Sequence, residues 1–164
     1  MRKPRAIVIT VSDSASRGER QDLSGPAARE ILEKMGCDVT AVEILPDEVT
    51  EIRENLIRLS DLDGIDLVVT TGGTGLAPRD VTPEATAAVI EKEVPGLAEL
   101  MRFEGAKTTP RAALSRARAG VRKRTLILNL PGSVKGVRES LSAVGPILSH
   151  ALEVVSGNTV RCGG

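Results

Sequence analysis

The chain has 164 residues, of which 41% are hydrophobic and 27% are charged, an ordinary composition for a globular protein that can bury a core. Lys plus Arg and Asp plus Glu both total 22, so the net charge is zero, and this argues against a general nucleic-acid-binding protein, which would need a basic surplus. No apolar run approaches the length of a membrane span, and the two cysteines are too few for a disulfide framework.

Residues 1–4 lead directly into an apolar run typical of a strand rather than into the hydrophobic segment of a signal peptide. We therefore expect one domain over residues 1–164, located in the cytoplasm, without a membrane or nucleic-acid partner. A local cluster of basic residues between Arg116 and Arg124 leaves two interpretations, a solvated hairpin or a basic patch. The solvated hairpin is favoured, because charge runs usually mark exposed faces.

The first half of the chain alternates strand and helix patterns. A β-branched run at residues 6–11 suits a buried parallel strand. A helix is expected from about residues 24–26, where Pro26 fits the first turn, and Gly36 ends it. Residues 39–45 predict a second strand, and the apolar positions from Val49 to Leu59 mark the next helix.

The second half begins with a third strand at residues 66–71, which runs into a glycine-rich loop. Thr82 is expected to be the N-cap of the next helix, with Pro83 as its first residue. Helical segments are predicted to continue to about residue 104, with an interruption near Pro95.

Two further strands, at residues 117–122 and 125–130, flank a short basic turn. A long helix then starts near Val134 and is expected to restart or kink at Pro146. Strands that alternate with helices predict an α/β protein with a parallel sheet covered on both faces.

In such a sheet, ligands bind beyond the carboxyl ends of the strands. The predicted strands are followed there by four loops rich in polar residues or glycine. These loops are residues 12–13, 46–47, 72–80 and 131–133. Their common position predicts one binding pocket.

The glycine loop, Gly72-Gly73-Thr74-Gly75, is the most informative of the four. Glycine allows positive φ and a close approach of the backbone to a ligand, and consecutive N–H groups can bind an anion. The loop is neither a Walker A sequence nor a dinucleotide fingerprint. It could be a simple tight turn, but ligand binding is favoured.

Asp80 and Asp47 are the candidate catalytic and metal-binding acids. Asp80 could cap the helix near residue 82, but Thr82 already fills that role, which leaves Asp80 for a metal ion or substrate. For Asp47, capping of the helix near Val49 is the favoured interpretation on local sequence. The alternative is that both carboxylates hold Mg²⁺, which prefers one or two carboxylates with phosphate oxygens and water.

Pro131-Gly132-Ser133 precedes the last helix, so Ser133 could be an N-cap or could help bind a phosphate at that helix start. Ser12 and Asp13 could bind hydroxyl or amino groups of a ligand. A structural role is favoured for His150, the only histidine, and no Ser–His or Cys–His pair is evident. The reaction is therefore expected to proceed without a covalent protein nucleophile.

Taken together, these residues resemble the molybdopterin adenylyltransferase family, the MogA/MoaB group with the related domains of gephyrin type. The resemblance covers nearly the whole chain. The motifs that carry it are Asp22-Leu23-Ser24-Gly25-Pro26, Leu45-Pro46-Asp47-Glu48, Thr71-Gly72-Gly73-Thr74-Gly75, Pro78-Arg79-Asp80-Val81-Thr82-Pro83-Glu84-Ala85-Thr86, Pro95-Gly96-Leu97, Leu114-Ser115-Arg116 and Asn129-Leu130-Pro131-Gly132-Ser133.

The resemblance implies a three-layer αβα sandwich around a mostly parallel sheet, assembled as a homotrimer or a dimer of trimers. It implies Mg²⁺-dependent transfer of AMP from ATP to molybdopterin, with a molybdate-insertion protein as the downstream partner. The acids that match Asp47 and Asp80 are needed for catalysis in the family, and the loops that match residues 72–75 and 131–133 hold pterin and phosphate groups.

One distinction within the family stays open. Some MoaB-type members lack the activity, and the intact Arg79-Asp80-Val81-Thr82-Pro83 favours the active type, whereas Pro131-Gly132-Ser133 is typical of MoaB-type members. The alternative function is therefore a non-catalytic molybdopterin-binding carrier or scaffold. A nucleotide-binding oxidoreductase is a third hypothesis, weakened because the dinucleotide fingerprint is missing.

Overall fold

The computed structural model describes residues 2–157. Its elements, in chain order, are β1 (Arg5–Val11), α1 (Asp13–Ser16), α2 (Ser24–Lys34), β2 (Asp38–Leu45), α3 (Val49–Ser60), β3 (Leu67–Thr71), α4 (Thr82–Ala87), β4 (Lys92–Glu93), α5 (Pro95–Thr108), the 3-10 helix η1 (Pro110–Leu114), β5 (Ala119–Arg122), β6 (Thr125–Leu130) and α6 (Val134–Ser156).

The strands form one six-stranded sheet in the order β2-β1-β3-β6-β5-β4. The four strands β2, β1, β3 and β6 are parallel, whereas β5 runs antiparallel to β6 and β4 runs antiparallel to β5. The predicted α/β class with a mostly parallel sheet is therefore confirmed. The two-residue β4 was not predicted, and it occupies the region where the helical segments were expected to be interrupted.

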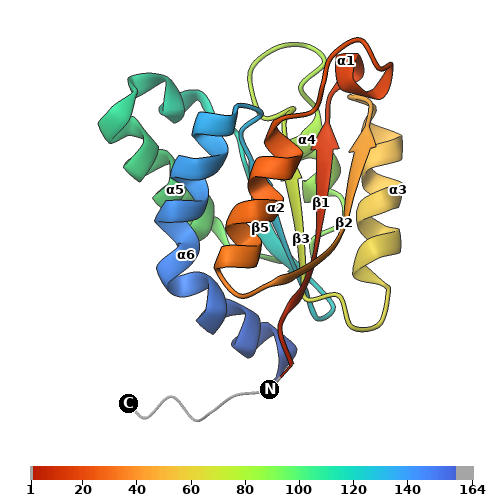
Figure 1. Ribbon diagram of the computed structural model, residues 1–164, viewed down its shortest axis with the longest axis vertical. Helices are drawn as coiled ribbons and strands as arrows, with labels where there is room; N and C mark the ends of the chain where they lie inside the picture. The colour runs from red at the N-terminus through yellow and green to blue at the C-terminus, as the bar shows by residue number, and fades with distance from the viewer. Residues whose placement is uncertain (1, 158–164) are drawn as a thin grey trace.

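Helices cover both faces of the sheet, which confirms the three-layer arrangement (Figure 1). Alternate residues of one strand serve the two faces, because successive side chains of a strand point to opposite sides. In β1, Ala6 and Val8 belong to the core that residues of α2, α5 and α6 share, whereas Ile7 and Ile9 belong to the core that residues of α3 and α4 share. Burial on both faces explains why β1, β3 and β6 are nearly continuous apolar runs rather than alternating ones.

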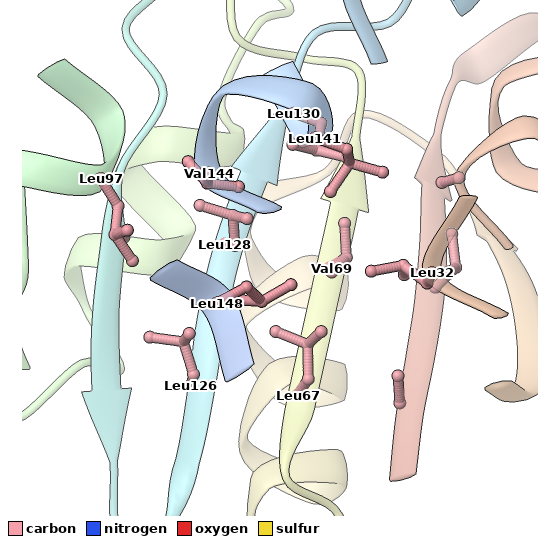
Figure 2. Close-up of a cluster of buried hydrophobic side chains, with 14 of the residues drawn as sticks. Leu32, Leu67, Val69, Leu97, Leu126, Leu128, Leu130, Leu141, Val144 and Leu148 are labelled. Carbon is pink, nitrogen blue, oxygen red and sulfur yellow. The ribbon is translucent and has the colours of Figure 1, made fainter. Parts of the chain in front are cut away.

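Figure 2 shows the larger of the two cores, between the sheet and α6. Leu148 of α6 lies between Leu67 of β3 and Leu126 of β6, and all three are almost fully buried. Each such side chain contributes on the order of 1.5–3 kcal/mol on burial. The core therefore fixes the sheet on which the strand-end loops sit.

Pro146 does not restart the last helix, which was one of its two predicted effects, because α6 is helical without a break from Val134 to Ser156. A proline inside a helix removes the hydrogen bond to the carbonyl four residues earlier. That carbonyl belongs to Ser142, which is exposed, so water can replace the lost donor.

The basic hairpin around β5 and β6 is neutralised by acids rather than presented as an open patch. Arg118 pairs with Glu93 at 2.7 Å, and Arg122 and Lys123 both pair with Asp61 at 3.1 and 3.0 Å. These contacts agree with the solvated hairpin that was favoured from sequence. Within residues 2–157, no helix combines the length and the apolar character needed to cross a membrane.

Candidate functional site

The four polar loops predicted at the strand ends do meet, as expected for a parallel sheet. The arrowheads of β1 and β2 in Figure 1 point to the upper edge of the sheet, where α1 lies. At this edge a cavity of about 490 Å³ receives residues from all four loops. The predicted site residues that line it are Ser12, Asp47, Gly72, Gly73, Asp80, Gly132 and Ser133.

Direct contacts hold these loops against one another. Thr71 donates a hydrogen bond from Oγ1 to the carbonyl of Pro131 at 2.7 Å, which joins the end of β3 to the loop after β6. A Cβ atom on Gly132 would lie 3.2 Å from Cα of Gly72. The two glycine-containing loops therefore pack backbone to backbone, a proximity that side chains would prevent.

Two residues of the glycine loop adopt the positive φ that glycine allows, +98° at Gly72 and +67° at Gly73, whereas Gly75 does not. A Cβ on Gly72 would overlap the carbonyl oxygen of Val11, and a Cβ on Gly73 would overlap Oγ1 of Thr82. The N–H of Gly72 donates to the carbonyl of Leu130 at 3.1 Å, which removes that amide from the expected anion donors.

Thr82 is not the N-cap of α4, so that prediction was wrong. It is the first residue of the helix, and its predecessor Val81 occupies the cap position without a side-chain cap. Thr82 is fully buried; its Oγ1 donates to the carbonyl of Gly72 at 3.0 Å and its N–H donates to the carbonyl of Gly73 at 3.2 Å. The threonine therefore closes the glycine loop.

Asp80 does not cap α4 either. Its Oδ2 accepts a hydrogen bond from the N–H of Ala77 at 2.9 Å, and its own N–H donates to the carbonyl of Ala77 at 2.9 Å. A Cβ on Gly75 would lie 2.8 Å from Oδ2 of Asp80. The carboxylate thus lies against the glycine loop, on the wall of the cavity.

Asp47 was expected to cap α3, and this interpretation was wrong. The residue before α3 is Glu48, and no side chain caps that helix. Asp47 and Asp13 instead exchange hydrogen bonds: the N–H of Asp13 donates to Oδ2 of Asp47 at 2.9 Å, and the N–H of Asp47 donates to Oδ1 of Asp13 at 3.0 Å. A Cβ on Gly73 would lie 3.2 Å from Oδ1 of Asp47, so this carboxylate faces the glycine loop.

The acids of the site have different electrostatic surroundings. Burial raises the pKa of Asp47, and the negative charges of Asp13 and Asp80 act in the same direction. Hydrogen bonds from Arg79 lower the pKa of Asp13, because Arg79 donates to both of its carboxylate oxygens at 3.0 Å. Arg79 also donates to Glu48 at 2.8 Å.

Asp13 therefore contacts other parts of the protein rather than the cavity, which its side chain does not line. The sequence placed Asp13 among the ligand-binding residues, and that role has no support in this arrangement. Its position instead links the end of β1 to the loop that carries Asp80.

A second cavity, of about 450 Å³, borders the second half of the glycine loop, whereas the first cavity borders Gly72 and Gly73. Thr74, Gly75, Pro131 and Ser133 line it, and Ser133 is common to both cavities. Apolar side chains, among them Met101 and Leu114, make up much of the remaining wall. Ser133 caps α6, as one of its two interpretations predicted, because its Oγ accepts from the N–H of Gly136 at 3.0 Å.

Sequence reasoning missed one wall of the first cavity, which residues 20–24 form. Asp22 anchors this wall: it accepts from Oγ1 of Thr10 at 2.8 Å and from the N–H of Gly25, in the first turn of α2, at 3.0 Å. An aspartate three residues before an expected helical glycine is a capping signal that could have found it. His150 is exposed on α6 and lies outside both cavities.

The acidic residues of the cavity fit a Mg²⁺ ion only in part. Among residues 2–157, no three or more His, Cys, Asp or Glu side chains gather closely enough to hold a metal ion by themselves. Asp47 and Asp80 do line the same cavity. Two carboxylates are a sufficient protein contribution where phosphate oxygens and water complete the Mg²⁺ coordination.

Comparison with known proteins gives a consistent match. The family described as "Probable molybdopterin binding domain" matches residues 7–150. The molybdopterin adenylyltransferase of Helicobacter pylori is 46% identical over 156 residues, which are 94% of this chain and 89% of that protein. The molybdopterin adenylyltransferase of Escherichia coli is 42% identical over 154 residues, covering 90% of this chain and 79% of that protein.

Among solved structures, the molybdopterin biosynthesis enzyme MoaB of Thermus thermophilus superposes with a TM-score of 0.89 at 57% identity, covering 96% of this chain and 99% of that one. The tungsten cofactor synthesizing protein MoaB of Pyrococcus furiosus superposes with a TM-score of 0.86 at 33% identity, covering 95% and 99%.

Proposed function

Because the chain belongs to the family of probable molybdopterin binding domains, we propose that it is a molybdopterin adenylyltransferase of molybdenum cofactor biosynthesis. It transfers AMP from ATP to the terminal phosphate of molybdopterin and releases pyrophosphate. The observation that carries this proposal is the meeting of Asp47, Asp80 and the glycine loop in one cavity, in a chain whose relatives carry that enzyme name over most of its length.

The chemistry requires two polyanions to be held side by side. The glycine loop and the loop at Gly132 expose backbone to the cavity, and backbone N–H groups can stabilise phosphate charge there. A phosphate oxygen of the pterin is already ionised, so it needs little help from a general base. Positioning of the reactants then supplies most of the rate enhancement.

Mg²⁺, when bound, would neutralise phosphate charge and polarise the phosphoryl group that is attacked. We assign Asp80 to holding the metal and orienting the ATP phosphates, because its carboxylate lies on the cavity wall beside Gly75. Asp47 shares the metal or orients its ligands. Desolvation of Asp47 favours a nearby cation, since a buried carboxylate is stabilised by positive charge.

The two cavities differ in chemical character and suit different parts of the ligands. The polar cavity with Asp47 and Asp80 suits the phosphates, and the neighbouring, more apolar cavity suits a flat ring. Ser133 borders both, so the reacting phosphate oxygens meet near this residue. Ser12, Thr74 and Pro131 then contact ligand at the margins of this region.

We further propose that the chain works in the cytoplasm, where ATP is available, as a homotrimer or a dimer of trimers. The adenylylated pterin passes to a molybdate-insertion protein, or to a tungstate-inserting one if the chain acts like the tungsten cofactor synthesizing relative of Pyrococcus furiosus. Light scattering would measure the assembly state.

The second candidate function is a non-catalytic molybdopterin carrier of the MoaB type. The observation in its favour is the 57% identity to the MoaB structure of Thermus thermophilus, together with Pro131-Gly132-Ser133. Both functions predict molybdopterin binding, and only the enzyme predicts turnover of ATP.

The test is pyrophosphate release from ATP with Mg²⁺ and molybdopterin. We expect turnover by the wild-type protein and nearly complete loss in Asp80→Asn, with molybdopterin binding still measurable. Asp61→Asn is the matched control, because Asp61 pairs with Arg122 and Lys123 where β6 begins, at the opposite end of the strands from the cavity. Binding of molybdopterin without turnover would favour the carrier, and an Asp80→Asn variant as active as wild type would refute the role of Asp80.

A further inference from the structure

Arg116 lies just before β5, outside the cavity lined by Asp47 and Asp80. In sequence it belongs to the basic cluster of residues 116–124 and to the family motif Leu114-Ser115-Arg116, but no role in the site was predicted for it. Its guanidinium nevertheless reaches the loop that carries Asp80, where it meets backbone carbonyls and one carboxylate.

The contacts of Arg116 fall at both ends of one short segment. Nε donates to the carbonyl of Gly75 at 2.8 Å, and Nη2 donates to the carbonyl of Asp80 at 2.8 Å. Nη1 pairs with the carboxylate of Glu84 in α4. The backbone N–H of Arg116 also donates to the carbonyl of Thr74 at 2.9 Å. One residue thus fixes the start and the end of residues 75–80.

The segment between those two carbonyls contains the partner of the Asp80 side chain. Asp80 Oδ2 accepts from the N–H of Ala77, within the same segment. Fixing residues 75 and 80 therefore fixes the orientation of the carboxylate that faces the cavity. A planar guanidinium can serve three separate acceptors at once, whereas a lysine ammonium is a compact charge that cannot reproduce this fork.

The backbone on either side of Arg116 is itself anchored. Arg102 of α5 donates from Nη1 to the carbonyl of Ser115 at 3.2 Å and to the carbonyl of Ala117 at 3.0 Å. Residues 115–117, which carry the guanidinium of Arg116, are therefore hydrogen-bonded to α5. The glycine loop is braced by the helical layer from this side and by Thr82 from the other.

We propose that Arg116 is a positioning residue for adenylyl transfer: it sets the conformation of residues 74–84 so that Asp80 and the glycine loop face the bound phosphates. The predicted effect of Arg116 on catalysis rests on the proposed function. The fixing of residues 74–84 by Arg116 rests only on the contacts given above.

The experiment compares Arg116→Lys and Arg116→Ala with Arg118→Lys as the matched control. Arg118 is two residues away and pairs with Glu93 instead of the loop. We expect Arg116→Lys to lower kcat by about 10- to 100-fold, as a small misplacement of a reacting group can. The KM for molybdopterin should change little. We expect Arg118→Lys to retain the wild-type kcat.

Two further measurements separate positioning from general stability. Amide hydrogen exchange should accelerate in residues 76–84 of Arg116→Lys, with the β1 and α6 amides unchanged. Added methylguanidine should restore part of the lost kcat in Arg116→Ala, because it can occupy the space of the missing guanidinium.

Wild-type kcat in Arg116→Lys would overturn the inference, as would unchanged exchange in residues 76–84 or exchange that rises equally throughout the chain. If the wild-type protein itself makes no adenylylated pterin, the proposed function fails. The exchange data then decide whether Arg116 fixes the loop.

Discussion

Replacing Gly73 with alanine should be one of the most damaging small changes in this protein. Gly73 has a φ of +67°, which an L-residue adopts at a cost. The added methyl would overlap Oγ1 of Thr82 and lie 3.2 Å from Oδ1 of Asp47. The substitution therefore disturbs the hydrogen bond from Thr82 to Gly72 and crowds one of the two candidate catalytic acids.

The magnitude follows from these contacts. The left-handed backbone costs about 1–2 kcal/mol, overpacking against Thr82 costs about 1–3 kcal/mol, and the disturbed hydrogen bond costs about 0.5–1.5 kcal/mol. Since these effects overlap, we expect a loss of about 3 kcal/mol in the free energy of unfolding.

Gly18→Ala is the matched control. Gly18 has a similar φ of +71°, but a Cβ there would meet no atom within 4 Å. Gly18→Ala should lower the free energy of unfolding by only about 1 kcal/mol, because it carries the backbone cost of a positive φ without any overlap of atoms. Alanine restricts the unfolded chain equally at either position, so that effect cancels in the comparison. Urea denaturation of both variants measures the difference in their free energies of unfolding, provided that the two m-values are equal. Equal losses at the two positions would refute the packing of the glycine loop described above.

Three other substitutions test the surroundings of the cavity. Thr82→Val should cost about 1–3 kcal/mol in urea denaturation, because the buried carbonyl of Gly72 loses its donor; Thr82→Ser should retain most of the stability, and equal losses in the two variants would contradict this. The Arg79 ion pair lowers the pKa of Asp13, so its contribution to stability is present above the unfolded pKa of about 4 and is lost as the pH falls through the folded value. The difference in unfolding free energy between wild type and Arg79→Ala should therefore shrink in acid, and a difference independent of pH would count against this ion pair. Burial raises the pKa of Asp47, so its ionised form opposes folding once the pH exceeds the folded value. Asp47→Asn should accordingly raise the urea midpoint at neutral pH while removing pyrophosphate release, and a lower midpoint would show that the charge of Asp47 stabilises the fold.

The sheet and its loops were predictable because their signals are local. The continuous apolar runs that became β1, β3 and β6 have the composition of strands buried on both faces. Once the strands are parallel, their carboxyl ends share one edge, and the loops that carry Asp47, Gly73 and Asp80 must lie near each other.

The side-chain partners within the site were not predictable, because they join segments far apart in the chain. Thr82 resembles an N-cap in sequence, but its hydroxyl donates to Gly72. Arg116 belongs in sequence to a cluster of basic residues, but in the structure it contacts Gly75, Asp80 and Glu84. The same residue types cap helices and donate hydrogen bonds to loop carbonyls, and only the folded chain decides which partner lies within reach.

The central claim is that two negatively charged reactants meet at the strand-end loops. The most direct measurement is a crystal structure of the protein with Mg²⁺, molybdopterin and an ATP analogue that cannot transfer its nucleotidyl group. The account predicts phosphate density between Gly73, Asp80 and Ser133, with the metal ion beside Asp80. Ligands bound away from that edge of the sheet, with this cavity filled only by water, would contradict it.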